Sequence, residues 1–185
     1  MCGLSPSNPN ASYDTIAYAP YVRYGELQVY EQGVARGSFG PTLPTDLLSV
    51  ERQGSTVRYL KNGVVFYTST VPSSGPLVVD AALYSWGGVI AEATFVEATS
   101  VTAVTESVRW VDVQGAAVSG STLTKTAVEG WGNAGAASAQ QILGDGRVTF
   151  RVPSSTSSVM CGLSPSNPNA SFDTIAYALY VRYGD

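Results

Sequence analysis

The sequence contains no histidine, only two cysteines and only two lysines among its 185 residues. Without histidine the chain cannot form a Ser-His-Asp triad, because the imidazole is the base that activates the serine. Two cysteines and no histidine also provide too few ligands for a four-coordinate zinc site. We therefore expect no metal ion or other cofactor, and we do not expect an enzyme.

Charge is scarce as well. Only 13% of the residues are charged and the formal net charge is −4, whereas globular chains carry about 25% charged residues. No basic stripe is available to contact phosphates, which argues against nucleic-acid binding. No apolar run approaches the roughly 18 residues that a membrane span requires, so membrane insertion is not expected.

One passage occurs twice in the chain. Residues 1–26 recur as residues 160–185 with three differences, which are Tyr13/Phe172, Pro20/Leu179 and Glu26/Asp185. The offset from Met1 to Met160 is 159 residues, which is too long for a solenoid unit and suits a whole domain. We expect a little over one period of a tandem array, cut inside a domain and without a signal peptide in this piece.

Alternating apolar and polar residues predict strands along most of the chain. The expected strands are 14–24, 26–30, 47–51, 56–60, 64–70, 76–84, 89–98, 108–113 and 148–152. Gly33, Asn62-Gly63, Trp86-Gly87-Gly88 and Asp145-Gly146 are turn signals between strands. Residues 134–142 could form a short helix, although we favour a strand or irregular structure. Short strands separated by frequent turns predict an all-β sandwich or barrel.

The two cysteines, Cys2 and Cys161, occupy the same position in the two copies. Equivalent positions in successive domains lie far apart, so a disulfide between them is not the first expectation. One small buried thiol per repeat is the simpler interpretation. That argument weakens if the two copies lie side by side, and the sequence leaves the redox state open.

Several passages resemble concanavalin A-like lectin/glucanase sandwich repeats of large bacterial surface and secreted proteins. The passages that carry the resemblance are GWGNAGAASAQQILGDGRVTFRV (130–152), MCGLSPSNPNASFDTIAYALYV (160–181), ELQVYEQGVARGSFG (26–40), DLLSVERQGSTVRYLKNGVVFYTS (46–69) and PLVVDAALYSWGG (76–88). The resemblance implies an antiparallel two-sheet jelly roll and a location on the cell surface or outside the cell. Glucanases of this type carry a Glu-x-Asp-x-x-Glu strand, which neither Glu92–Glu97 nor Asp112 reproduces.

The family order would be approximately 107–185 followed by 27–98. We therefore expect 1–98 to be the C-terminal part of one repeat, 99–106 a junction, and 107–185 the N-terminal part of the next. The two parts can complete one compact sandwich in circularly permuted order, in which two copies of one strand segment compete for one position. Alternatively, the parts complete each other between molecules as a strand-swapped assembly.

Candidate ligand-binding residues are Trp86, Asp80 and Asn62. Trp86 lies beside two glycines that leave its indole ring accessible to the apolar face of a sugar, and Asp80 and Asn62 could bind hydroxyl groups. Each also has a structural interpretation: Asn62 belongs to a turn, Trp86 lies at a strand end, and Asp80 caps a backbone donor. Trp110 and Trp131 are expected in the core.

The resemblance and the lack of a recognisable set of catalytic residues leave two main functions for a secreted or cell-surface protein. One is a lectin-like, adhesive repeat module that binds carbohydrate, with neighbouring repeats of the same protein adding avidity. The alternative is a structural spacer without a ligand. A fragment of a glycan-active enzyme is a second alternative, because a fold by itself does not determine function.

Overall fold

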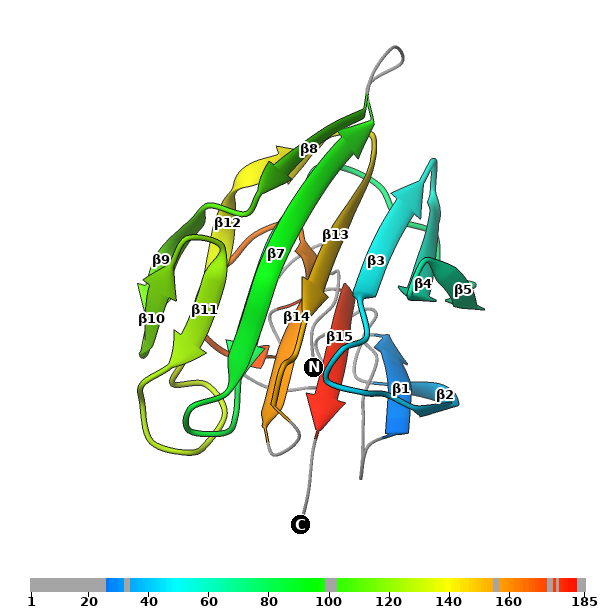
Figure 1. Cartoon of the computed structure of the whole chain (residues 1–185). Coiled ribbons are helices and arrows are strands. Elements are labelled where there is room, and N and C mark those ends of the chain that lie inside the picture. Colours follow the sequence, from blue (N-terminus) through cyan, green and yellow to red (C-terminus); the bar gives the residue numbers. More distant parts are fainter. Residues whose placement is uncertain are drawn as a thin grey trace.

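A computed structural model of the chain describes residues 26–31, 34–98, 103–154, 157–172, 175 and 177–182. Within these residues the backbone forms fifteen strands (Figure 1). They are β1 (Glu26–Glu31), β2 (Val34–Pro41), β3 (Leu48–Gln53), β4 (Thr56–Lys61), β5 (Val64–Thr68), β6 (Leu77–Leu83), β7 (Val89–Ala98), β8 (Ala103–Ser107), β9 (Trp110–Gln114), β10 (Ala116–Ser119), β11 (Thr122–Lys125), β12 (Gly135–Ile142), β13 (Asp145–Arg151), β14 (Ser158–Ser164) and β15 (Tyr177–Arg182).

The strands form two antiparallel sheets. Sheet A has the order β2-β1-β15-β14-β6-β12-β9, and sheet B has the order β10-β11-β7-β13-β3-β4-β5, with β8 paired to β7. The prediction of an all-β, antiparallel two-sheet sandwich is confirmed. Strands from 26–98 and strands from 103–182 contribute to both sheets, so the two parts of the chain are joined in one sandwich (Figure 1).

The Asn62-Gly63 hairpin between β4 and β5 forms as predicted. Asn62 has a φ of 53° and Gly63 a φ of 79°. Both residues therefore lie in the left-handed region that a two-residue hairpin turn requires, and asparagine and glycine tolerate that region best. Local sequence chemistry alone was sufficient to locate this turn.

The predicted turn at Asp145-Gly146 is wrong, because both residues belong to β13 and the bend lies at 143–144. Gly146 instead permits a close approach. A Cβ atom built there would lie 2.6 Å from the carbonyl oxygen of Val96 and 2.8 Å from Cγ2 of Ile142. Glycine is required here by packing against a neighbouring strand.

Other segments differ in smaller ways from the expectation. The expected junction at 99–106 overlaps β8, which extends the β7 ladder with Ala98 opposite Ala103. Residues 135–142 are strand β12, in agreement with the preference for a strand. The strand pattern missed β2, β8, β10, β11 and β14. The expected strand 14–24, the turn at Gly33, and Cys2 lie outside the described residues.

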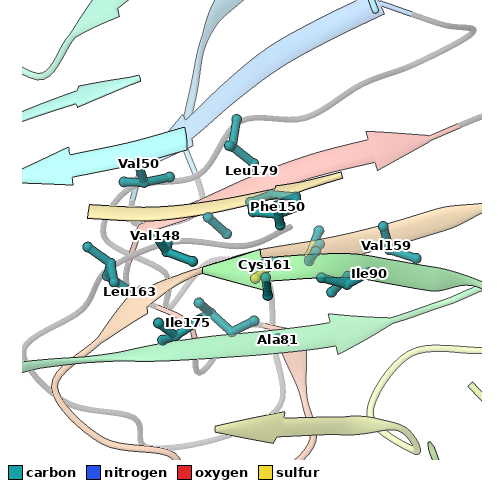
Figure 2. Packing of buried hydrophobic residues seen from close by; sticks show 14 of the residues in the cluster. Val50, Ala81, Ile90, Val148, Phe150, Val159, Cys161, Leu163, Ile175 and Leu179 are labelled. Carbon is teal, nitrogen blue, oxygen red and sulfur yellow. The ribbon is translucent and has the colours of Figure 1, made fainter. Parts of the chain in front are cut away.

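The core lies between the two sheets (Figure 2). Val50, Ile90, Val148 and Phe150 extend from sheet B and meet side chains of sheet A, among them Cys161. Cys161 is a buried free thiol, as predicted for this repeat, and burial raises its pKa well above the usual range. Among the described residues no helix has the length and apolar character of a membrane-spanning segment.

Candidate functional site

The side chain of Trp86 is exposed to solvent. Among the large apolar residues that the structure describes as exposed, Trp86 is the aromatic one, with an exposed fraction of 72%. It lies on the turn between β6 and β7, where Gly87 has a φ of 70°. Gly88 follows, and a Cβ built there would lie 2.9 Å from both the Ser85 carbonyl oxygen and Cγ1 of Val159. The two glycines therefore allow a tight turn against the core, which holds the indole ring toward solvent.

Backbone hydrogen bonds fix this turn on two sides. The amides of Tyr84 and Ser85 both donate to the carbonyl of Ser158, at 2.9 and 3.2 Å, and the Ser158 amide donates to Oγ of Ser85 at 2.8 Å. On the other side, the Gly87 amide donates to the Lys125 carbonyl at 3.3 Å, and the Lys125 amide donates to the Gly88 carbonyl at 2.9 Å. The Trp86 side chain thus projects from a fixed backbone.

The side chain of Lys125 joins the Trp86 turn to the loop between β11 and β12. Its buried ammonium group donates to the carbonyls of Leu83 at 2.8 Å and Gly130 at 2.7 Å, and to Oδ1 of Asn133. All three donors of the ammonium group are used. Burial lowers the pKa of Lys125 to about 8, because the charged form loses water, while the nearby Glu129 carboxylate opposes the shift.

The loop between β11 and β12 adds a second exposed apolar side chain, Val128, which is 75% exposed. The Val128 carbonyl accepts a hydrogen bond from Nδ2 of Asn133 at 3.0 Å, and the Gly130 amide donates to the Tyr84 carbonyl at 3.0 Å. Trp86 and Val128 therefore stand on two loops that are bonded to each other. We call these two side chains and the loops 84–88 and 126–134 the Trp86 platform.

An aromatic cluster supports the platform. The ring of Trp131 lies 5.2 Å from Tyr84, 4.7 Å from Phe172 and 5.4 Å from Tyr180, measured between ring centroids. Tilted and edge contacts of this kind are favourable for aromatic rings. Trp131 packs against the core and Trp110 is 9% exposed, as both were expected to do.

The structure does not bring the three predicted ligand residues together. Asp80 is 1% exposed in the centre of sheet A, opposite Gly162 of β14, and burial raises the pKa of its carboxyl well above the usual range. Asn62 lies in the β4–β5 turn of sheet B, where its Oδ1 accepts from the Leu47 amide at 2.8 Å and its Nδ2 donates to Asp46 at 2.7 Å. Of the three, Asp80 is buried, Asn62 is exposed but its amide group is bonded within the turn, and Trp86 presents a ring that is 72% exposed.

Sequence reasoning missed Lys125 and the loop that it holds. The signal was present in Thr122–Lys125, because strand alternation places Lys125 on the same face as the buried Leu123. An inward-facing lysine on a strand needs hydrogen-bond acceptors, since a buried charge is costly without them. The acceptors come from residues 83, 130 and 133, and no local pattern indicates that these lie together.

A hollow of about 200 Å³ lies near the start of β13. Charged side chains of both signs line it, and the lining residues are Glu51, Arg52, Gln53, Val96, Ala98, Asp145, Gly146 and Arg147. The Arg52 guanidinium already donates to the backbone carbonyls of Gly75, Ile142 and Gly144.

Glu92 and Glu97 belong to the stretch that comes nearest to the Glu-x-Asp-x-x-Glu sequence of glucanases, and both carboxylates form contacts within the fold. Glu92 forms an ion pair with Arg151 at 2.9 Å, and Oε1 of Glu97 accepts from the Leu143 amide at 3.0 Å. Within the described parts of the chain, no three acidic or cysteine side chains gather as metal ligands would. Comparison with family models, curated protein sequences and solved structures gives no match.

Proposed function

We propose that this chain is a non-catalytic β-sandwich module that binds carbohydrate through the Trp86 platform. The observation that carries the proposal is the 72% exposure of Trp86 on a turn whose backbone is bonded on both sides. An indole ring held in this way offers a flat apolar face to a pyranose ring with little loss of conformational freedom on binding. Val128, which is 75% exposed, adds an apolar side chain on the loop that is hydrogen-bonded to Tyr84.

The surroundings of the ring support a weak, avidity-dependent interaction. Two exposed apolar side chains provide a small contact, so a single module is expected to bind weakly and repeated modules more tightly. The passage that occurs at both 1–26 and 160–185 supports repetition in the parent protein. The resemblance to concanavalin A-like repeats supports a surface or secreted location, with neighbouring repeats as further partners.

The proposal is tested on a glycan array with the biotinylated chain tetramerised on streptavidin, which supplies the avidity. We expect binding by the unchanged chain and at least a roughly tenfold loss for Trp86→Ala, the size typical of an aromatic anchor residue. Leu143→Ala is the matched control, because Leu143 is also an exposed apolar loop residue, at 67%, and it lies on the β12–β13 turn. This control should bind like the unchanged chain.

Thermal unfolding of each variant separates loss of binding from loss of fold. Failure of the intact, folded chain to bind any glycan would reject carbohydrate recognition and favour the spacer function, which the repeated passage also suits. Equal loss of binding in Trp86→Ala and Leu143→Ala would reject the Trp86 platform as the site. Glycan turnover during the assay would favour the enzyme-fragment alternative.

A further inference from the structure

Sheet A contains a position that is filled by a strand pair from the second copy of the repeated passage. β14 and β15 lie between β6 and β1, and we call this position the strand-pair slot. On one side β14 pairs with β6, with Cys161 opposite Ala81, and on the other side β15 pairs with β1, with Leu179 opposite Val29. Figure 1 shows β14 and β15 in orange and red among the strands of the earlier chain.

The first copy carries almost all of the side chains that the slot buries. The buried residues of the second copy are Met160, Cys161, Leu163, Ser164, Ala170, Ser171, Phe172, Ile175, Tyr177, Ala178, Leu179, Tyr180 and Val181. At the positions 159 residues earlier the first copy has the same residue except Tyr13 for Phe172 and Pro20 for Leu179. Residues 1–23 therefore carry the side chains that a second occupant of the same slot would need.

The register of β1 also fits the first copy. β1 pairs Gln28 with Tyr180 and Glu31 with Tyr177. The residues that correspond to Tyr180 and Arg182 in the first copy are Tyr21 and Arg23, and only Tyr24 and Gly25 separate Arg23 from Glu26. The same register would thus close a hairpin with a two-residue loop that contains glycine, which is a common hairpin connection.

One difference between the copies bears directly on which of them fills the slot. Leu179 is fully buried in β15 and lies opposite both Cys161 and Val29, so its strand is paired on both sides. The first copy has Pro20 at this position. Proline has no amide hydrogen and is confined to edges, strand starts or bulges, so it disfavours the first copy in a strand with two neighbours.

We propose that the strand-pair slot is an exchangeable binding site for which residues 1–23 and 160–182 of the same chain compete, and that the Pro20/Leu179 pair decides the outcome. The unchanged chain holds the second copy in the slot. Exchange of these two residues between the copies places the first copy there and releases the second.

Each copy carries its own reporter of occupancy. The slot buries one thiol, which is Cys161 when the second copy is bound. The equivalent thiol of the first copy is Cys2. Because a buried thiol is protected from a maleimide reagent until the structure opens, the protected cysteine identifies the bound copy.

The experiment compares maleimide labelling of the two cysteines by peptide mass spectrometry on monomeric protein isolated by size exclusion. In the unchanged chain we expect Cys161 to be protected. In the double variant Pro20→Leu/Leu179→Pro, labelling of Cys161 should rise by roughly tenfold or more while Cys2 becomes the protected thiol.

Stability provides an independent measurement, because Leu179→Pro alone puts proline in both copies and should destabilise or unfold the chain. Addition of Pro20→Leu should restore the folded state, whereas addition of Pro44→Leu, at a proline outside the repeated passage, should not. The proposal is overturned if Pro20→Leu gives no rescue. It is also overturned if the rescued protein still protects Cys161, or if protection moves to Cys2 only in dimers.

Discussion

The two ends of β6 are each held by a buried cation, and the comparison between them is instructive. At the start of β6, Arg52 donates to the carbonyls of Gly75 and Gly144 and to that of Ile142. At its end, Lys125 donates to the carbonyls of Leu83 and Gly130 and to Asn133. Each cation thus joins β6 to a neighbouring loop through neutral oxygen atoms.

The difference between the ends is the chemistry of the cation. Burial lowers the pKa of both groups, but a guanidinium group remains protonated at any ordinary pH. Lys125, with its pKa lowered to about 8, can lose its proton in mildly alkaline solution. The charge on Arg52 therefore does not change with pH in the ordinary range. The charge on Lys125, at the end of β6 that carries the Trp86 platform, does change with pH. The following predictions test this comparison.

The largest effect is expected for Arg52→Met. The substitution leaves the carbonyls of Gly75, Ile142 and Gly144 without the donors that Arg52 supplies, and a loss of about 3 kcal/mol in the free energy of unfolding should follow. Urea denaturation followed by tryptophan fluorescence measures it. Arg58→Met is the control, because Arg58 is a partly exposed residue that donates to the exposed Gln53 side chain and lies 3.8 Å from Glu51, and it should cost less than about 1 kcal/mol. Equal losses for the two variants would contradict the role assigned to Arg52.

Lys125→Met should have a smaller effect, about 1–2 kcal/mol, because removal of a desolvated charge offsets part of the lost hydrogen bonding. Acrylamide quenching of tryptophan fluorescence should change as well, since the backbone that holds Trp86 is loosened. Lys61→Met is the matched control, because Lys61 donates to the Pro41 carbonyl at 2.8 Å in an exposed position. A Lys125→Met variant as stable as the unchanged chain would show that the loop is held by its backbone bonds alone.

The smallest effect is a pH dependence that belongs to the Lys125 end. The folded-state pKa of about 8 is below the ordinary 10.5, so between these values the unfolded chain binds more protons and stability rises with pH. The expected gain from pH 7.5 to 9.5 is on the order of 1 kcal/mol relative to Lys125→Met. Burial raises the pKa of Glu31 to about 7, so its contribution is lost as pH rises from 4.5 through 7, mostly below this window.

Arg52→Met should retain the same alkaline rise, because Lys125 is unchanged in this variant and the hydrogen-bond acceptors of Arg52 are backbone carbonyls. The pH dependence of stability measured for Lys125→Met is subtracted from that of the unchanged chain. This removes the contributions of Glu31, Asp80 and Cys161, which are present in both proteins. An alkaline rise that persists in Lys125→Met would assign the titration to another buried group and remove the proposed difference between the ends.

Prediction from sequence succeeded where the controlling interactions are local. The Asn62-Gly63 turn needs two residues that tolerate positive φ, and these residues are adjacent. The prediction failed at Asp145-Gly146, where the same kind of dipeptide serves a close contact with Val96 of another strand. At the candidate site, Trp86 and its glycines were recognisable, whereas the burial of Asp80 depends on strands that lie on both sides of β6.

The sequence by itself determined the alternating strands, the tight turns and the presence of two nearly identical passages, because these depend on residue type and spacing along the chain. Only the tertiary structure decided that the second passage lies between β6 and β1, that Lys125 binds two loops, and that Asp80 is buried while the Trp86 ring is exposed. The physical reason is that burial and hydrogen-bond partners are set by residues distant in sequence, which converge only when the two sheets pack.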